Sequence, residues 1–474
     1  MRAEMIGVLH RIPAHTVIGA LMVATAMLAG GGGSPSPISE LMVQLIYAAL
    51  TCGWLWLAAV PGQPLLPNAR GVWILSALAL IIPVVQLIPL PPTLWHALPG
   101  QADRSAALAL VGADQLWHPL SLAPAHTVAS LLAINPALLM MIATAALDRR
   151  GRAILLSVVA TLALASALLG AVQLPLGVAA PRLYAVSNLG VTGFQANKNA
   201  AADVLLIGLL AVAAAVAPSL VIEEKTRRER IIADPRAAWV VLGGAALLLV
   251  FATVFTNSRA GIALIPVALA GTWLMLAPAL PRALRRRWLP IIPLALGALV
   301  LAGGTLYSGN SALGTVFRRF AVADQVRREL WHDAWYALRQ SWPAGIGVGG
   351  AEHALVAAER LEVVDPSAPN RVHNDYLEFA LEGGLAAVAV MLGTAAVAFG
   401  AAWRGLGRVE ERDQVIVGIS IIAIVGLHSC VDYPIRSMAL ACLTGMGAGL
   451  LFPSPNSPGR RPDALDRRVM GSQT

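Results

Sequence analysis

Charged side chains are scarce in this sequence. They make up 13% of the 474 residues, whereas hydrophobic residues make up 57%, and the mean hydropathy is +0.70. Because soluble domains carry about 25% charged residues, this composition excludes an ordinary soluble protein. Apolar runs of about twenty residues, each long enough to cross a bilayer as a helix, recur along the chain. We therefore predict an all-α polytopic membrane protein, with residues 1–474 forming a single transmembrane domain.

Cysteine is also scarce. Cys52, Cys430 and Cys442 lie in or beside apolar runs without paired spacing, so we predict neither a disulfide framework nor a metal site. The sequence lacks HExxH and CxxC, and no GK[ST] follows the glycine-rich stretch 343–350, which excludes a phosphate-binding nucleotide loop. That stretch is predicted to be a loop that lets backbones approach closely. We expect no cofactor, and no removable signal peptide, because no short apolar region with a cleavage site opens the chain.

Twelve apolar runs are predicted to span the membrane, and the segments that join them differ in charge. Most of the 34 lysine and arginine residues lie in alternate segments, such as 148–152, 223–230 and 282–287. By the positive-inside rule, these segments and both termini lie in the cytoplasm. The predicted spans are residues 14–33, 38–60, 71–90, 124–147, 153–176, 198–220, 237–256, 260–280, 288–307, 375–401, 414–432 and 436–452.

This orientation places the long loop 308–374 on the opposite face, which is the periplasm if the membrane is the inner membrane of a Gram-negative bacterium. The loop contains an amphipathic helical pattern over 317–341 and a second short helix near 351–363. Topology also explains the net charge of +8, and no basic face is interleaved with aromatic residues, so no nucleic-acid partner is expected. Residues 453–474 are predicted to be a disordered cytoplasmic tail.

One group of polar residues stands at the outer mouth of the sixth predicted span, in "GFQANKNAAADVL". Asn197 and Asn199 would cap the helix while Lys198 extends to the interface. Alternatively, these side chains contact a substrate. Asp203 lies one turn below Asn199 on the same face, and a carboxylate at that depth usually faces a polar cavity.

The motif "TNSRAG" (256–261) forms a very short outer turn between two predicted spans. Ser258 would cap the second of these helices. Arg259 would then lie at the membrane surface, where it binds either a lipid phosphate or the phosphate of a substrate through its planar guanidinium.

A third motif, "QVRRELWHDAW", belongs to the amphipathic pattern in the long loop. Arg327, Trp331 and Trp335 share one helical face, so the tryptophans would anchor the helix at the membrane and Arg327 would point along the surface. Arg328 would be solvated or paired with a glutamate. The pattern is also typical of a helix that merely lies at the interface.

The stretch "NRVHNDYLEFALEGG" opens the tenth predicted span with a cluster of ionisable residues. Asp375 and Glu378 match a helix cap followed by an acidic residue three positions later. Glu382 lies one turn further in, before two glycines that would allow close helix approach. His373 precedes the helix and has no evident packing role, and a histidine at this boundary is suited to accept a proton.

The fifth motif is "HSCVDYP", at the outer end of the eleventh predicted span. His428 and Asp432 are four residues apart on one helical face, so they can form a pair. We predict that this pair supports the reacting groups without itself reacting.

Together these motifs resemble those of the O-antigen ligase/polymerase family of polytopic glycosyltransferases. The resemblance rests on "GFQANKNAA", "TNSRAG", "RRELW" followed by "PAGIGVG", "HNDYLEFALEGG" and "HSCVDYP", which cover about 190–435 in this order. It implies a periplasmic enzyme that transfers a glycan from undecaprenyl diphosphate to an acceptor hydroxyl, without a nucleotide or an essential metal. It also implies that Arg259, Arg327 and His373 are catalytic, with Arg328 as an alternative to Arg327.

The implied chemistry suits these residue types. Two arginines would stabilise the charge that develops on the diphosphate, His373 would deprotonate the acceptor hydroxyl, and direct displacement would invert the anomeric carbon. We assign Arg328, Asn197, Lys198, Asn199, Asp203 and Glu382 to substrate binding, and Asp375, Glu378, His428 and Asp432 to support of the catalytic groups.

The acceptor stays open at this stage. It is lipid A–core for a ligase, the end of another lipid-linked glycan for a polymerase, or a protein, and ligase and polymerase share this motif set. A transporter is the alternative from another class. Transporters place ionisable residues near the bilayer midplane, whereas here they gather at one outer face.

Overall fold

The computed structural model describes residues 12–33, 36–58, 66–184, 190–220, 234–279, 325–360 and 370–455. Within these ranges the chain is helical, apart from the two-residue strands β1 (Pro89–Leu90) and β2 (His118–Pro119), which pair antiparallel. The predicted helical class is therefore confirmed. The predicted span 288–307, the tail from 456 onwards and the 308–324 and 361–369 parts of the predicted loop lie outside the described residues.

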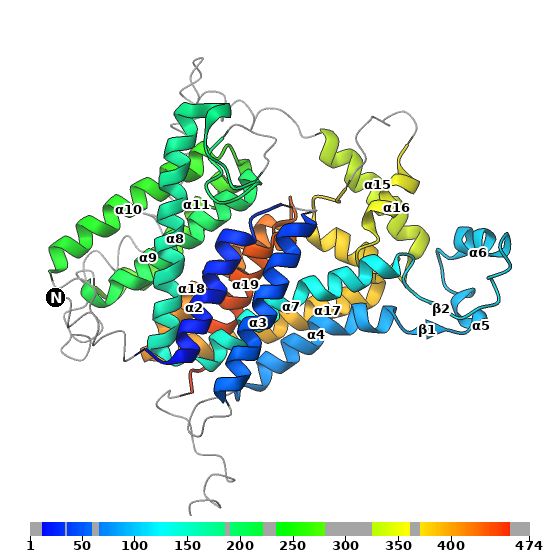
Figure 1. Cartoon of the computed structure of the whole chain (residues 1–474), viewed down its shortest axis with the longest axis horizontal. Coiled ribbons are helices and arrows are strands. Elements are labelled where there is room, and N and C mark those ends of the chain that lie inside the picture. The colour runs from blue at the N-terminus through cyan, green and yellow to red at the C-terminus, as the bar shows by residue number, and fades with distance from the viewer. Residues whose placement is uncertain are drawn as a thin grey trace, which may run out of the picture.

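Long helices run side by side as a bundle (Figure 1). Seven of the described helices are long and apolar enough to cross a membrane, and α2, α4 and α19 are shorter apolar helices. Each predicted span other than 288–307 coincides with a bundle helix, while the count of twelve stays a prediction. The bundle helices are α2 (Ala14–Ala29), α3 (Pro37–Ala58), α4 (Arg70–Gln86), α7 (Pro124–Ala146), α8 (Arg149–Leu176), α9 (Lys198–Leu220), α10 (Pro235–Phe255), α11 (Arg259–Leu276), α17 (Asp375–Leu406), α18 (Arg412–His428) and α19 (Met438–Leu450).

Helix α9 is the centre of one half of the bundle. Its most apolar window is 94% buried, compared with 11% for α17, and it packs against α8, α10, α11 and α18. Between Asp203 and Ser219 the helix is apolar on every side, and such a helix must be enclosed by protein or lipid. Small residues permit the close packing, since a Cβ at Gly208 would collide with Ala163. A carboxylate on α9, such as Asp203, is therefore surrounded by protein.

A smaller core lies beyond the bundle, between α15 (Gln325–Ser341), α16 (Ala351–Ala358) and the start of α17. Ala334, Leu338, Leu355 and Leu381 are buried there. Helix α15 ends before Pro343, as predicted. Its inner face is the Ala334–Leu338 side, whereas Trp335 is exposed and stacks with Arg339. The short helix predicted near 351–363 is α16.

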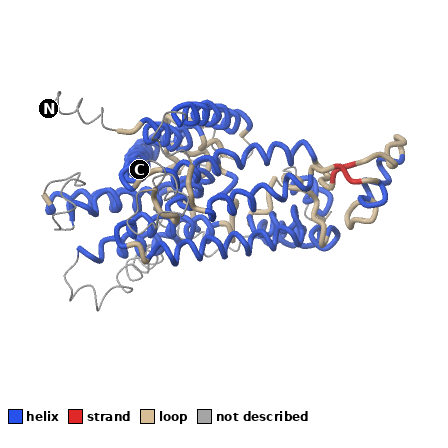
Figure 2. Tube along the Cα trace, turned by 90° about the horizontal axis from the view of Figure 1, so that it is seen from below, coloured by secondary structure: helices blue, strands red, loops and turns tan. Residues whose placement is uncertain are grey.

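A second extramembrane segment follows β1, at the far right of Figure 1, and contains α5 (Pro92–Trp95) and α6 (Ala102–Ala109). Figure 2 shows this segment, with the strand pair in red, beyond the ends of the bundle helices. Short 3-10 turns complete the described structure: η1 (Gly177–Ala179), η3 (Ala277–Ala279), η4 (Val409–Glu411) and η5 (Pro434–Arg436).

The glycine-rich loop 343–350 packs against an interruption in α17. Gly384 has φ 59° and ψ −144°, which is not helical, and any side chain there would collide with the Pro343 carbonyl. The Leu385 N–H donates to that carbonyl (3.0 Å), and the Gly347 N–H donates to the Glu382 carbonyl (2.9 Å). The predicted close approach is confirmed for the loop. The predicted close approach of a helix holds at Gly383, where a Cβ would lie 3.2 Å from Ile82 of α4, whereas the loop occupies the space at Gly384.

Candidate functional site

His373 lies at the centre of a polar site at one end of the bundle, between the small core and the first turn of α17. Its Nδ1 is 2.9 Å from Asp432 Oδ1, and its ring packs edge-on against Tyr433 at 4.7 Å between centroids. The backbone has φ 55°, a left-handed conformation that non-glycine residues adopt at a cost and that is common at functional sites. Since Asp432 accepts the Nδ1 proton, the neutral ring carries its lone pair on Nε2.

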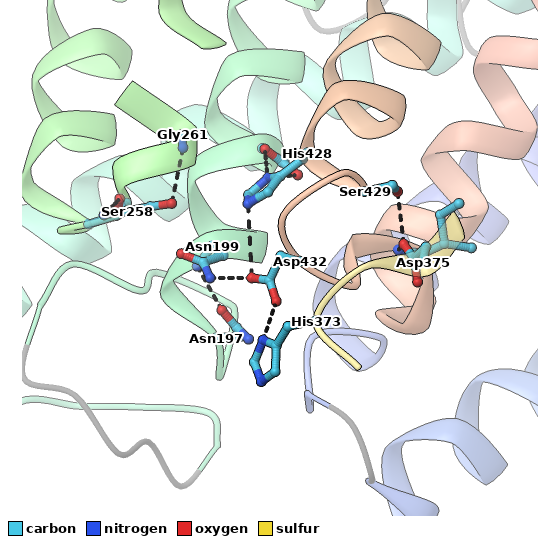
Figure 3. Close-up of polar contacts among 12 residues, drawn as sticks. Asn197, Asn199, Ser258, Gly261, His373, Asp375, His428, Ser429 and Asp432 are labelled. Atoms are coloured by element: carbon cyan, nitrogen blue, oxygen red, sulfur yellow. Dashed lines mark hydrogen bonds and ion pairs between the residues drawn. The ribbon is translucent and has the colours of Figure 1, made fainter. Parts of the chain in front are cut away.

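Asp432 links His373 to a second histidine on a different helix. His428, the last residue of α18, has its Nδ1 2.8 Å from both carboxylate oxygens of Asp203 on α9. Its Nε2 faces Asp432 Oδ2 at 3.9 Å. These contacts define the His428 chain: Asp203, His428, Asp432 and His373 in that order. Figure 3 shows Asp432 between His428 and His373. His428 therefore faces Asp432, as predicted, but this contact is the longer of the two that His428 makes. Its nearer partner is Asp203.

Asp203 does not face an open cavity. Its side chain is fully buried, because α9 is enclosed by its neighbours, and His428 takes both of its oxygens. This position places Asp203 behind the reacting groups, so direct contact with a substrate, as predicted, would require rearrangement of the pair.

Asn197 and Asn199 lie between this chain and the surface. Asn197 Oδ1 accepts the backbone N–H of Asn199 at 2.7 Å and so caps α9, as predicted. The Asn199 amide donates to Asp432. A small pocket opens here, lined by Gly33, Asn197, Asn199, Ala200, Asp432, Tyr433, Pro434 and Ser437. Lys198, the first residue of α9, is partly exposed beside this pocket.

The first turn of α17 is capped one residue earlier than predicted. Asn374 Oδ1 accepts the Leu377 N–H at 3.0 Å, so Asp375 is not the cap. Asp375 instead accepts the Ser429 hydroxyl at 2.8 Å and the Ile435 N–H at 3.4 Å. Asp375 therefore joins α17 to the segment that follows α18.

Glu378 and Glu382 form a buried ion-pair cluster with Arg371 and Arg436, which we name the Arg436 cluster. Arg436 is 2.9 Å from Glu378 Oε1 and 3.0 Å from Glu382 Oε2, while Arg371 is 3.0 Å from Glu378. Both carboxylates are fully buried. The interpretation of Glu378 as simply a helix-start residue was wrong. Its carboxylate pairs with Arg371, which precedes the helix, and with Arg436, which lies far away in the sequence.

The Arg436 cluster holds the backbone just before His373 and that of the glycine-rich loop. The Val372 N–H donates to Glu378 Oε2 at 3.0 Å, and the Gly349 N–H donates to Glu382 Oε1 at 2.8 Å. Gln86 donates to the Glu382 carbonyl at 2.8 Å. Glu382 thus connects α4, the glycine-rich loop and η5.

The two predicted catalytic arginines begin helices at the same end of the bundle. Arg259 is the first residue of α11, where Ser258 accepts the Gly261 N–H at 3.1 Å and caps the helix as predicted. Arg327 lies in the first turn of α15 and is partly buried, whereas Arg328 is exposed. This difference favours Arg327 over Arg328 as the arginine that faces the site.

Charges around Asp432 favour its ionised form. Burial by itself raises the pKa of Asp432, but the hydrogen bond from His373 and the charges of His373, His428 and Arg327 together bring the pKa below its ordinary value. Asp432 lies beyond the end of α18, at the rim of the pocket. A carboxylate at this position can therefore orient His373 and stabilise the imidazolium that forms when His373 accepts a proton.

Several residues of the site were not singled out from the sequence. Arg371 lies in the stretch that opens α17, and Arg436 follows the motif "HSCVDYP" by two residues. Ser437, whose buried hydroxyl has no hydrogen-bond partner among the described residues, and the glycine run 30–33 also line or flank the pocket. Four consecutive glycines at 30–33 are the sequence signal that could have indicated this part of the site. The structure requires them, because Gly33 has φ 86° and side chains at Gly31 or Gly32 would collide with neighbouring atoms.

The site residues occur both inside and outside a stretch that matches a known family. Residues 244–392 match the family model for O-Antigen ligase, a stretch that includes Arg259, Arg327 and His373. A search of curated proteins found no match. Asp203, His428 and Asp432 lie outside the matched stretch and reach it through hydrogen bonds. Over residues 244–392, the chain is therefore similar to the O-antigen ligase family.

Proposed function

We propose that the protein is a glycosyltransferase of the ligase type, which transfers a glycan from undecaprenyl diphosphate to a hydroxyl of lipid A–core. The family supports an O-antigen ligase or polymerase type of activity and a membrane location. The observation that carries the proposal is the contact between His373 Nδ1 and Asp432. It gives His373 the geometry of a general base at the rim of a pocket, with Nε2 as the nitrogen that accepts a proton.

The proposed reaction is a single displacement at the anomeric carbon. The acceptor oxygen attacks this carbon, its proton moves to His373 Nε2, and the bond from the carbon to the diphosphate oxygen breaks. The anomeric configuration is inverted. His373 then returns its proton to solvent or to the released diphosphate.

The leaving group needs stabilisation of negative charge at the membrane surface. Arg259 and Arg327 each open a helix at the end of the bundle where His373 lies, and a guanidinium can donate two parallel hydrogen bonds to phosphate oxygens. Arginines preorganised around a developing charge lower the barrier because they need not reorient during the reaction. We therefore assign the diphosphate to Arg259 and Arg327. Asn197, Lys198 and Asn199 are assigned to the sugar, because Asn197 and Asn199 line the pocket beside Asp432 and Lys198 lies between them in the sequence.

We further propose that this end of the bundle faces the periplasm and that both termini lie in the cytoplasm of the inner membrane. The alternating charge of the joining segments supports this orientation. A transporter is disfavoured because the ionisable chain ends at a helix terminus, where His373 is 28% exposed, whereas transporters bind near the bilayer midplane.

The decisive experiment is transfer by the purified, reconstituted protein, with undecaprenyl-diphosphate-linked glycan as donor and lipid A–core as acceptor. We expect transfer by the wild type and its loss in the Arg259→Ala and Arg327→Ala variants. His353→Ala is the matched control, because His353 lies on α16 at the same end of the bundle, against His126. Wild-type rates in folded Arg259→Ala and Arg327→Ala variants would overturn the mechanism.

Product analysis separates the ligase from the polymerase. In a deletion strain, a ligase defect leaves full-length polymer on its lipid carrier, whereas a polymerase defect shortens the polymer. If the deletion strain makes short polymer, the acceptor is a second lipid-linked glycan and not lipid A–core.

A further inference from the structure

The His428 chain contains a buried histidine that the proposed reaction does not use directly. His428 is 1% exposed and its partner Asp203 is fully buried. The Nδ1 of His428 meets both Asp203 oxygens at 2.8 Å. Its Nε2 has no hydrogen-bond partner among the described residues, and the nearest carboxylate oxygen across from it belongs to Asp432, at 3.9 Å.

This geometry distinguishes the two charge states of His428. If the ring were neutral with its proton on Nδ1, the lone pair on Nε2 would point towards a carboxylate oxygen in a buried site, which is unfavourable. If both nitrogens carry protons, each N–H points at a carboxylate. Two buried carboxylates in one site also cannot both remain ionised easily without a cation between them.

We propose that His428 is held as an imidazolium between Asp203 and Asp432. The pair of Asp203 and His428 keeps Asp432 ionised and positioned, and it thereby sets how readily His373 accepts a proton. This inference rests on the proposed function for its consequence, because His373 is the base of that reaction. It assigns no direct substrate contact to Asp203 or His428.

The groups that face His428 come from three sides of its helix. Asp203 lies on α9, Asp432 lies on the segment after α18, and the charge of Arg327, on α15, acts on Asp432 as well. Asn199 donates to Asp432 from the first turn of α9. The carboxylates of Asp203 and Asp432 balance the charges of His428 and Arg327. Loss of the charge on His428 therefore leaves His373 facing a carboxylate whose negative charge is not compensated.

The consequence for the reaction has a definite sign. A positive charge behind Asp432 opposes protonation of His373, because the two cations repel through the shared carboxylate. When that charge is removed, His373 takes up a proton more readily from solvent and is lost as a base at a higher pH. The acidic limb of kcat/KM against pH therefore moves upwards.

The test measures kcat/KM against pH for the reconstituted wild type, Asp203→Asn and His428→Gln. We expect the acidic midpoint to rise by about half to one pH unit in His428→Gln, which corresponds to about a threefold to tenfold additional loss of activity on the acidic side. In Asp203→Asn the rise should be smaller, because His428 gives up its proton once its nearest carboxylate is gone and the two lost charges are opposite in sign. The matched control is Glu411→Gln, which removes another buried carboxylate, at the opposite end of the bundle, and should leave the midpoint in place. Midpoints equal to that of the wild type would reduce the pair to a structural role and overturn the inference.

A measurement independent of activity keeps the two proposals separable. In ¹⁵N-histidine-labelled wild type, the two ring nitrogens of His428 should resonate close together at neutral pH, as in an imidazolium, with the signals assigned by their loss in His428→Gln. Widely separated resonances would show a neutral ring and overturn the inference even if the enzyme transfers glycan. An imidazolium in a protein that transfers no glycan would leave the charge assignment intact while the proposed function fails.

Discussion

A buried polar group lies at each end of the bundle, Arg152 at one and the His428 chain at the other. The two groups differ in how completely their hydrogen-bonding atoms have partners. Arg152, the fourth residue of α8, is fully buried, and its guanidinium donates to the carbonyls of Thr144, Ala145, Leu147 and Phe452 at 2.8–3.0 Å. It thereby closes the end of α7 and the segment after α19, whose carbonyls have no helical partner.

The His428 chain at the other end is less complete. It includes a buried nitrogen without a partner, a histidine in a left-handed conformation and a ring that is 28% exposed beside a pocket. Saturated hydrogen bonding serves structure, whereas unsatisfied and strained groups gather at functional sites. Substitutions at the two ends should therefore separate stability from activity.

The largest expected effect is on catalysis at the His373 end. His373→Gln removes the base but keeps a polar side chain, so transfer should fall by about 10²- to 10⁴-fold, while thermal unfolding in detergent changes little. Rates of glycan transfer and a melting curve on the same sample check this. A variant that unfolds without a change in its specific rate would contradict the comparison.

Arg152→Met should show the opposite pattern. The substitution fills a similar volume but leaves several buried carbonyls without donors, and each such group costs about 1–3 kcal/mol. We expect the free energy of unfolding to fall by about 3 kcal/mol or more, while the transfer rate per folded molecule stays at the wild-type value. Denaturation followed by both tryptophan fluorescence and activity measures the two quantities.

Gly384→Ala should have an intermediate effect, in which stability and the transfer rate decline together. The left-handed backbone and the Pro343 carbonyl both oppose a side chain there, which should cost about 1–3 kcal/mol. Because the loop also holds Glu382, transfer should decline with stability. Gly243→Ala is the control, since no atom lies within 4 Å of a side chain at Gly243.

The smallest effect concerns acid stability, in which the two ends should behave alike. The pKa of Glu411 is also below its ordinary value: burial raises it, but hydrogen bonds from Ser454 and the charge of Arg152 lower it further. A carboxylate with a lowered folded-state pKa stabilises the protein above its unfolded pKa, and that contribution is lost as the pH falls through the folded value. Wild-type melting temperature should therefore drop below about pH 4, and less steeply in Glu411→Gln or Asp432→Asn. Equal slopes in all three proteins would contradict the lowered pKa values.

Much of the candidate site could be predicted from local patterns. Ser258 and Asn197 cap their helices as their positions indicated, and the glycine-rich loop makes the close approach that its composition required. Such features depend on residues within one turn, so periodicity and side-chain type suffice. Two predictions failed because tertiary partners overrode local ones: Asp375 binds Ser429 instead of capping α17, and Glu378 binds Arg436.

The sequence by itself determined the helical character of the chain, because hydrophobic runs act locally. It also singled out His373, whose place before a helix needs no knowledge of neighbours. Only the tertiary structure decided that Asp203 pairs with His428 and that Asp432 turns towards His373. These partners are 225 and 59 residues apart, and only the packing of α9 against α18 and of the α17 entry against the segment after α18 brings them within hydrogen-bonding distance.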